Sequence, residues 1–159
     1  LLISPEDVTE NGKRISSRSI KELLCSGNIT GASLLLGAPY FITGEVNRGL
    51  GLGKSFGFPT VNTELPPLAP PLKNGVYKTR CETERGTYDA LTNVGICPTV
   101  GVRKKHLETY ILGCEGDLYG KDVKIYFLDF IRPEKKFDST EQLIMQIKVD
   151  IKTAFNNKE

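Results

Sequence analysis

The apolar residues in the first part of the chain recur at a helical period. Ile20, Leu23 and Leu24 lie on one face of a segment that follows the serines between positions 16 and 19 and ends at Gly27. A second, shorter helix is predicted over residues 30–36, directly before another glycine. Two helices this short cannot enclose a hydrophobic core of their own. We therefore expect them to pack either on the part of the chain that follows or on a domain outside it.

From residue 40 onward, short segments rich in β-branched and aromatic residues alternate with Gly, Pro and Asn. Six of these segments predict strands, over residues 40–47, 60–64, 76–82, 88–95, 107–114 and 122–132. Because no helical pattern lies between them, they favour an antiparallel sandwich or barrel over a parallel sheet. The proline-rich run at 66–71 cannot pair in the middle of a sheet and predicts a stiff surface connection.

The last predicted element is a helix that closes the domain. Asp138 and Glu141 have the spacing of a capping box at its start. The apolar residues that follow fall on one helical stripe: Leu143, Ile144, Ile147, Ile151, Ala154 and Phe155. The pattern thus predicts a helical segment over residues 1–38 and a mainly β domain over residues 39–159, with this helix covering one side of the sheet.

Composition narrows the classes of protein that fit this pattern. With 21 basic and 19 acidic residues the net charge is only +2, so nucleic acid is not an expected partner. No apolar run approaches the about 20 residues that span a membrane, and we expect neither a membrane partner nor a location outside the cytoplasm. The four cysteines form no CxxC pair, which argues against a zinc site and favours reduced thiols. Leu1 stands where a natural start has Met, and we interpret the chain as a fragment.

The segment at 44–62, GEVNRGLGLGKSFGFPTVN, carries the clearest chemical signal. Its five glycines would let backbone amides approach phosphate oxygens closely, and Lys54 adds a mobile positive charge. It is not a Walker A loop, because Arg48 occupies the place of the first glycine and Pro59 follows where a helix should begin. The dinucleotide-binding spacing fails as well. Taken alone, a flexible glycine-rich hairpin explains the segment equally well.

Thr60 and Asn62, at the end of this segment, shift the balance toward phosphate binding. Two residues apart in an extended strand, their side chains point to the same face. Both offer neutral oxygen ligands, which suit a magnesium ion held chiefly by phosphates and water.

The same string resembles the signature of riboflavin kinases, in which a glycine-rich loop runs into G-[FI]-P-T-x-N. The resemblance continues through NGVY at 74–77, NVGICPT at 93–99, LETYIL at 107–112, GDLYG at 116–120 and IRPEKKFDSTEQL at 131–143. It implies a mainly β fold, a six-stranded antiparallel Greek-key-type barrel with a C-terminal α-helix, preceded here by the short helical segment. It also implies an enzyme that transfers the γ-phosphate of ATP to the 5′-hydroxyl of riboflavin, giving FMN.

The resemblance assigns roles to individual residues. It implies that Glu108 is the catalytic base and that Mg²⁺ bound with ATP is held by Thr60 and Asn62. The remaining residues implied for the nucleotide are Gly49, Gly51, Gly53, Lys54 and Tyr119, and those implied for the flavin are Arg132, Lys135 and Phe137.

The residues themselves leave alternatives open. A lone glutamate such as Glu108 usually lies on a solvated strand face, although phosphoryl transfer to an alcohol needs a group that accepts its proton. The sole histidine, His106, shares parity with Glu108, so alternation does not exclude it. We expect His106 to be exposed at the start of its strand, beside the basic run at 103–105. The charges around Arg132 also suit an ordinary turn before the helix.

Residues 14–40 resemble the end of the adenylyltransferase domain in bacterial bifunctional enzymes that make FMN and then FAD. Those proteins carry a K-I-S-S-T-x-I-R-type sequence; Ser16 and Ser17 match it, whereas Lys21 stands in place of the arginine. The nucleotide-binding motif of that domain is absent from this sequence, so we expect the chain to be a kinase module that makes no FAD alone. Two alternatives remain: a flavin- or nucleotide-binding module without turnover, and a β-barrel interaction domain.

Overall fold

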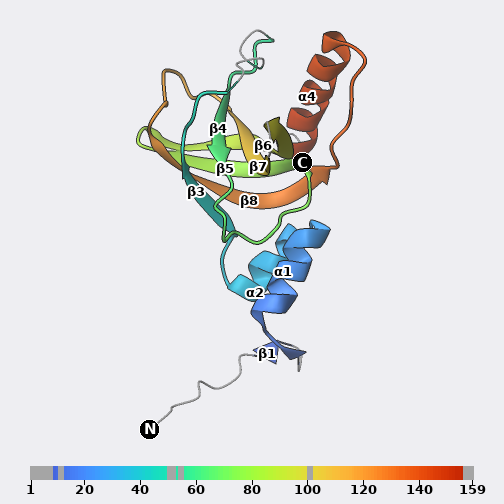
Figure 1. Ribbon diagram of the computed structural model, residues 1–159. Helices are drawn as coiled ribbons and strands as arrows, with labels where there is room; N and C mark the ends of the chain where they lie inside the picture. Colours follow the sequence, from blue (N-terminus) through green and yellow to red (C-terminus); the bar gives the residue numbers. More distant parts are fainter. Residues whose placement is uncertain (1–8, 11–12, 50–52, 54–55, 100–101, 156–159) are drawn as a thin grey trace.

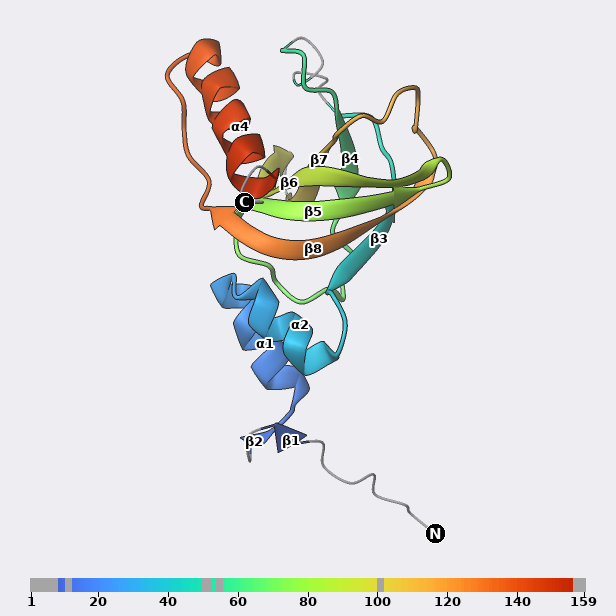
Figure 2. The ribbon, with the colours of Figure 1, turned by 180° about the vertical axis from the view of Figure 1, so that it is seen from behind.

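The computed structural model describes residues 9–10, 13–49, 53, 56–99 and 102–155. Six strands form one antiparallel sheet that curves into a nearly closed barrel, with one helix against its outer surface and two helices below it (Figures 1 and 2). The elements in chain order are β1 (Thr9–Glu10), β2 (Lys13–Arg14), α1 (Ser17–Ser26), α2 (Ile29–Leu36), β3 (Phe41–Glu45), β4 (Thr60–Glu64), β5 (Gly75–Thr83), β6 (Gly86–Thr99), β7 (Val102–Ile111), β8 (Asp122–Arg132) and α4 (Thr140–Phe155). No helix among these described residues is long and apolar enough to span a membrane.

The strand order confirms the predicted topology. The sheet runs β3-β8-β5-β6-β7-β4, and every neighbouring pair is antiparallel. β5, β6 and β7 follow one another along the chain, and β8 returns to pair with β5, which is the strand order of a Greek key. The edge strands β3 and β4 contact each other, which nearly closes the barrel.

Among the six predicted strands, β7 differs most from its predicted bounds. β7 begins at Val102 and ends at Ile111, whereas the sequence pattern placed it over residues 107–114. The basic run hides the alternation of polar and apolar residues, but pairing with β6 keeps this stretch extended: Lys105 lies opposite Ile96. Beyond Ile111, Gly113 has a φ of 71°, a left-handed conformation that ends the strand.

The interior of the barrel contains a chain of hydroxyl groups among its apolar side chains. Thr79, Thr92 and Thr109, all fully buried, come from three neighbouring strands. Thr92 Oγ1 lies 2.9 Å from Thr79 Oγ1 and 3.0 Å from Thr109 Oγ1, while Thr79 Oγ1 also donates to the carbonyl of Ala90. The hydroxyls of these three threonines therefore all have a hydrogen-bond partner. Because Thr109 points inward, the residues on either side of it in β7 point to the outer surface.

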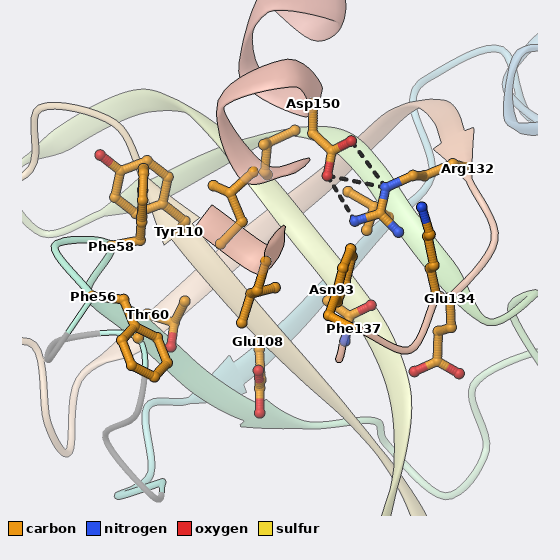
Figure 3. A pocket seen from close by; sticks show the side chains of 16 residues that line it. Phe56, Phe58, Thr60, Asn93, Glu108, Tyr110, Arg132, Glu134, Phe137 and Asp150 are labelled. Carbon is orange, nitrogen blue, oxygen red and sulfur yellow. Dashed lines mark hydrogen bonds and ion pairs between the residues drawn. The ribbon is translucent and has the colours of Figure 1, made fainter. Parts of the chain in front are cut away.

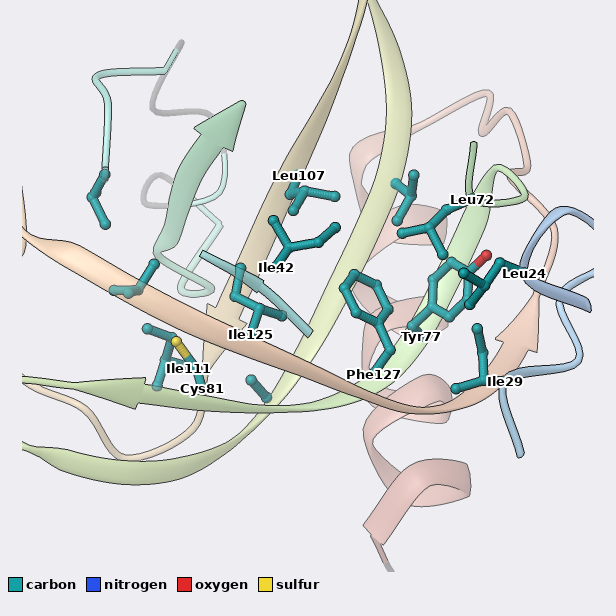
Figure 4. Close-up of a cluster of buried hydrophobic side chains, with 14 of the residues drawn as sticks. Leu24, Ile29, Ile42, Leu72, Tyr77, Cys81, Leu107, Ile111, Ile125 and Phe127 are labelled. Atoms are coloured by element: carbon teal, nitrogen blue, oxygen red, sulfur yellow. The ribbon is translucent and has the colours of Figure 1, made fainter. Parts of the chain in front are cut away.

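The two N-terminal helices pack on the barrel, which settles the choice that the sequence left open. Leu24 of α1 and Ile29 of α2 belong to the same buried cluster as Tyr77 and Phe127 of the barrel (Figure 4). The Tyr77 and Phe127 rings meet edge to face, with centroids 5.2 Å apart. Assignment of residues 1–38 to a separate domain stays a prediction.

Helix α4 begins one residue later than the predicted capping box implies. Ser139, instead of Asp138, is the cap: the Gln142 amide donates to Ser139 Oγ at 3.3 Å. Gln142 Oε1 in turn accepts from the Asp138 amide, so Gln142 takes the place predicted for Glu141 in both bonds, and a serine satisfies the first turn as well as an aspartate. The predicted apolar stripe is right, since Ala154 packs with Val76 and Leu91 of the sheet.

Candidate active site

A cavity of about 320 Å³ lies between α4 and the outer face of the barrel (Figure 3). Helix α4 contributes Leu143 and Ile147 to its wall, and the aromatic rings come from Phe56, Phe58, Tyr110 and Phe137. Its polar side chains include Asn93, Glu108, Arg132 and Glu134. A volume in this range and a mostly apolar wall with a few polar groups are typical of small-molecule sites.

Strand register places Glu108 in a row of polar side chains. Glu108 of β7 lies directly opposite Asn62 of β4 on one side and Asn93 of β6 on the other. Directly opposed residues share a face of the sheet, so all three side chains point outward. Their neighbour Leu107 is fully buried, whereas the Glu108 side chain is 45% exposed and borders the cavity. The next outward row pairs Thr60 with Tyr110.

His106 is not exposed, contrary to the expectation from the sequence. Its side chain is only 22% exposed, and its Nε2 lies 3.2 Å from Glu108 Oε1. The expectation failed because β7 starts at Val102, which places His106 well inside the strand. Nδ1 is buried with no hydrogen-bond partner among the described residues. The tautomer with its proton on Nε2 therefore fits best: it donates to the carboxylate and avoids a buried, unpaired N–H.

The glycine-rich segment approaches β4 so closely that side chains are excluded. A Cβ at Gly49 would overlap the Asn62 carboxamide, and one at Gly53 would overlap the backbone carbonyl of Phe58 and lie 3.2 Å from Thr60 Oγ1. The start of the segment is tied to β4 by the Asn47 amide, which donates to the Asn62 carbonyl at 2.7 Å. Gly51 and Lys54, also predicted for the nucleotide, lie outside the described residues.

Thr60 and Asn62 fit the magnesium ion that the resemblance implies. Within the described part of the chain, neither Thr60 Oγ1 nor the Asn62 carboxamide has a hydrogen-bond partner, so their oxygens are available. Because Gly49 and Gly53 carry no side chain, the backbone of the glycine-rich segment lies directly beside these two donors. Both donors are neutral oxygens, which suit an ion that phosphates and water also coordinate.

A second hollow, of about 520 Å³, adjoins the first at Thr60, which borders both. Its wall is formed by β4 and by the connection between β7 and β8, including Cys114, Asp117 and Tyr119. The Tyr119 ring is 47% exposed, and the Arg48 guanidinium carbon lies 5.6 Å from its centroid. Tyr119 and Glu108 thus line different cavities, which share Thr60.

The three residues predicted for the flavin all line the first cavity, but Arg132 is already engaged. Its Nη2 lies 2.8 Å from Asp150 Oδ2 and its Nε 2.9 Å from Asp150 Oδ1, as the dashed lines in Figure 3 show. Asp150 is 3% exposed and also accepts a hydrogen bond from Gln146 at 2.9 Å. The Phe137 ring lies within 6 Å of both cations, at 5.8 Å from Arg132 Cζ and 5.7 Å from Lys135 Nζ.

Sequence reasoning missed several residues that the structure brings to this site. Asp150 interrupts the apolar stripe of α4, and that position on a buried face was the available signal. Asn93 could have been found only from the register of β6 against β7. Glu134, in the IRPEKKF motif, accepts a hydrogen bond from Asn74 at 3.0 Å and lies against Gly95.

This arrangement defines a small-molecule site with a carboxylate and neutral oxygen donors on one face of a Greek-key barrel. The family model described as riboflavin kinase (Flavokinase) matches residues 36–157, and the chain belongs to this family. The resemblance found in the sequence is thereby confirmed.

Curated relatives carry the same family name together with a second activity. The chain is 37% identical over 145 residues to a bifunctional riboflavin kinase/FMN adenylyltransferase of Haemophilus influenzae, covering 91% of this chain and 47% of that protein. The protein of the same name from Bacillus subtilis is 35% identical over 154 residues, covering 94% and 48%. The chain therefore spans about half the length of the curated relatives it matches.

Two solved structures share the fold. A crystal structure from Streptococcus pneumoniae, described as a macrolide-efflux protein, aligns with a TM-score of 0.85 and 35% identity over 96% of this chain and 50% of that one. A riboflavin kinase from Trypanosoma brucei aligns with a TM-score of 0.55 and 29% identity over 74% and 78%.

Proposed function

We propose that this chain phosphorylates riboflavin with ATP and releases FMN and ADP. The observation that carries the proposal is the row of Asn62, Glu108 and Asn93 on neighbouring strands, at the edge of a cavity large enough for a small molecule. A carboxylate beside neutral metal ligands is what phosphoryl transfer to an alcohol requires. Membership of the riboflavin kinase family supports riboflavin as the alcohol.

The flavin is proposed to occupy the cavity under α4. The isoalloxazine is a flat aromatic ring system, and the rings of Phe58, Tyr110 and Phe137 together with the apolar side of α4 offer a matching wall. Lys135 lies beside Phe137 and supplies positive charge. Arg132, held in place by Asp150, would supply positive charge from the same wall.

The nucleotide is proposed to occupy the second hollow, which shares Thr60 with the first. Gly53, which lines the first cavity beside Thr60, and Gly49, beside Asn62, would bring backbone close to the phosphates, and Tyr119 offers a ring face to the base. Gly51 and Lys54 are assigned by the resemblance alone. Thr60 and Asn62 would hold Mg²⁺, which supplies neutralisation of the phosphate charge when bound. Since Thr60 borders both spaces, the γ-phosphate would lie near the boundary between them.

The proposed reaction forms one oxygen–phosphorus bond and breaks another. Glu108 accepts the proton of the ribityl 5′-hydroxyl while that oxygen attacks the γ-phosphorus in line, and ADP leaves. Because His106 donates to Glu108 Oε1, the second carboxylate oxygen remains free to face the substrate. The hydrogen bond also fixes the orientation of the carboxylate without neutralising it.

Formation of FMN from riboflavin and Mg-ATP, followed by chromatography, tests the proposal, with Glu108→Gln as the decisive variant. The variant keeps the shape of the side chain but accepts no proton, and we expect its turnover to fall about 100-fold or more. Riboflavin binding and the melting temperature should be retained, because Glu108 is half exposed. Glu22→Gln, on the exposed face of α1, is the matched control.

Unchanged turnover in Glu108→Gln would overturn the assignment of the base. Binding of riboflavin by the wild-type chain without FMN formation would favour a binding module instead. Monitoring FAD in the same run tests the expectation that this chain makes none.

We also propose a partner domain and a cellular location for this module. The names of the curated relatives support an adenylyltransferase domain as partner in the full-length protein. The described cysteines Cys25, Cys81 and Cys114 are all free thiols, which supports a location in the reducing cytoplasm.

A further inference from the structure

The connection between β7 and β8, residues 112–121, forms one wall of the hollow proposed for the nucleotide. Asp117, Leu118 and Tyr119 all line it. The connection contains three glycines in left-handed conformation, at positions 113, 116 and 120, with φ of 71°, 93° and 71°. Such a segment has little intrinsic preference for one shape, because glycine loses the most conformational freedom on ordering. Contacts from elsewhere must therefore hold it.

The ends of the connection are held by backbone hydrogen bonds to Val46 and Asp89, and its middle is held by the side chain of Arg85, at the tip of the β5–β6 hairpin. Its Nη1 donates to the carbonyl of Glu115 and its Nη2 to the carbonyl of Asp117, the latter at 3.1 Å. Gly116 lies between these two carbonyls, and a Cβ there would overlap the guanidinium. The planar fork of an arginine suits two backbone acceptors at once.

The hairpin tip is itself ordered in a way that directs Arg85. Thr83 Oγ1 accepts from the Arg85 amide at 3.1 Å and donates to the Gly86 carbonyl at 3.1 Å. Next to Arg85, Glu84 forms an ion pair of 2.9 Å with Lys121, where the connection joins β8. The hairpin tip thus contacts both the middle and the end of the connection.

The connection transmits this contact to the ring that faces the hollow. Asp117 Oδ1 accepts from the Tyr119 amide at 2.9 Å, so the position of Asp117 determines that of Tyr119. Tyr119 in turn lies under the Arg48 guanidinium of the glycine-rich segment. Arg85 itself borders neither cavity, and no residue of the 112–121 connection lines the described wall of the cavity under α4.

We propose that Arg85 is a positioning residue for the nucleotide: it holds the 112–121 connection, and through Asp117 the Tyr119 ring, in the shape that binds Mg-ATP. The inference rests on the proposed function, because it takes the hollow beside Tyr119 as the nucleotide site. The proposed role concerns only the nucleotide, because the 112–121 connection does not line the described wall of the flavin cavity. Loss of Arg85 should weaken nucleotide binding and leave riboflavin binding unchanged.

The test compares Arg85→Ala and Arg85→Lys with Arg80→Ala. Arg80 lies on the same hairpin, and its side chain makes, with the described part of the chain, only an exposed contact of 4.0 Å with Asp89. For Arg85→Ala we expect the KM for Mg-ATP and the Kd for Mg-ADP, measured by calorimetry, to rise about five-fold, equivalent to about 1 kcal/mol. The KM for riboflavin should stay at the wild-type value. Arg85→Lys should fall between, because an ammonium group cannot match the two-pronged geometry.

Two results would overturn the inference: an unchanged Kd for Mg-ADP in both Arg85 variants, or an equal rise in the KM values of both substrates. The second would mean that Arg85 supports the whole barrel. Failure of the kinase proposal is distinguishable, because a wild-type chain that binds Mg-ADP but makes no FMN contradicts the proposed reaction while the calorimetric comparison still tests Arg85. Arg80→Ala must behave as wild type in both measurements.

Discussion

The ion pair between Arg132 and Asp150 joins the end of β8 to α4, and we expect Asp150→Ala to lower the free energy of unfolding. Asp150 is 3% exposed, and the Arg132 side chain 19%. Three hydrogen bonds connect the two side chains, and Gln146 adds a fourth to Asp150. Removing the carboxylate leaves a guanidinium with little water around it and, among the described residues, only the Pro133 carbonyl as acceptor.

The expected loss of stability follows from this burial. Breaking a buried ion pair by removing one partner costs about 3–5 kcal/mol. Because Arg132 keeps some access to solvent and one acceptor, we place Asp150→Ala near the lower end, at about 3 kcal/mol. For a chain of this size each kcal/mol corresponds to about 3 °C, so the melting temperature should fall by about 9 °C. A double variant, Arg132→Met with Asp150→Leu, leaves no unpaired charge and should lose much less.

Urea unfolding followed by circular dichroism measures these free energies, and the KM for riboflavin provides a second readout. Since Arg132 and Phe137 line the flavin cavity, Asp150→Ala should raise that KM and leave the KM for Mg-ATP unchanged. A loss below about 1 kcal/mol would refute the reasoning. The reasoning would also be refuted if the double variant lost as much stability as Arg132→Met and Asp150→Leu lose separately when added together, because the side chains would then act independently.

Two further predictions concern close approach and burial. Gly49→Ala should raise the KM for Mg-ATP about ten-fold with little change in stability, because the new Cβ displaces the Asn62 carboxamide. Gly37→Ala, at the end of α2 with a φ of 71° and open space around it, should instead cost about 1 kcal/mol of stability and leave both KM values unchanged. Burial raises the pKa of the Cys81 thiol to about 12, so at pH 8 iodoacetamide should label exposed Cys25 in the native protein and Cys81 only after unfolding, as peptide mass mapping will show.

Each of these has a clear contrary outcome. A wild-type KM for Mg-ATP in Gly49→Ala would mean that the Asn62 carboxamide takes no part in nucleotide binding. Equal labelling rates for the two cysteines in the native protein would mean that the barrel opens far more readily than its packing implies.

Local patterns in the sequence determined most of the fold and the kind of site. Alternation and turn residues located the strands, and the apolar stripe located α4, because these features depend on neighbours along the chain. The motif around Thr60 and Asn62 indicated phosphate and metal chemistry in the same way. The boundaries were less certain, as the start of β7 at Val102 and the cap at Ser139 show.

Only the tertiary structure decided which of these residues meet. Alternation assigns Glu108 to an outward face, but the strand register determines that Asn62 and Asn93 lie beside it. Arg85 reaches the carbonyl of Glu115 across 30 positions of sequence, a contact that no local pattern encodes. The physical reason is that periodicity reports the environment on each side of a residue, whereas partners are chosen by the packing of segments that are distant along the chain.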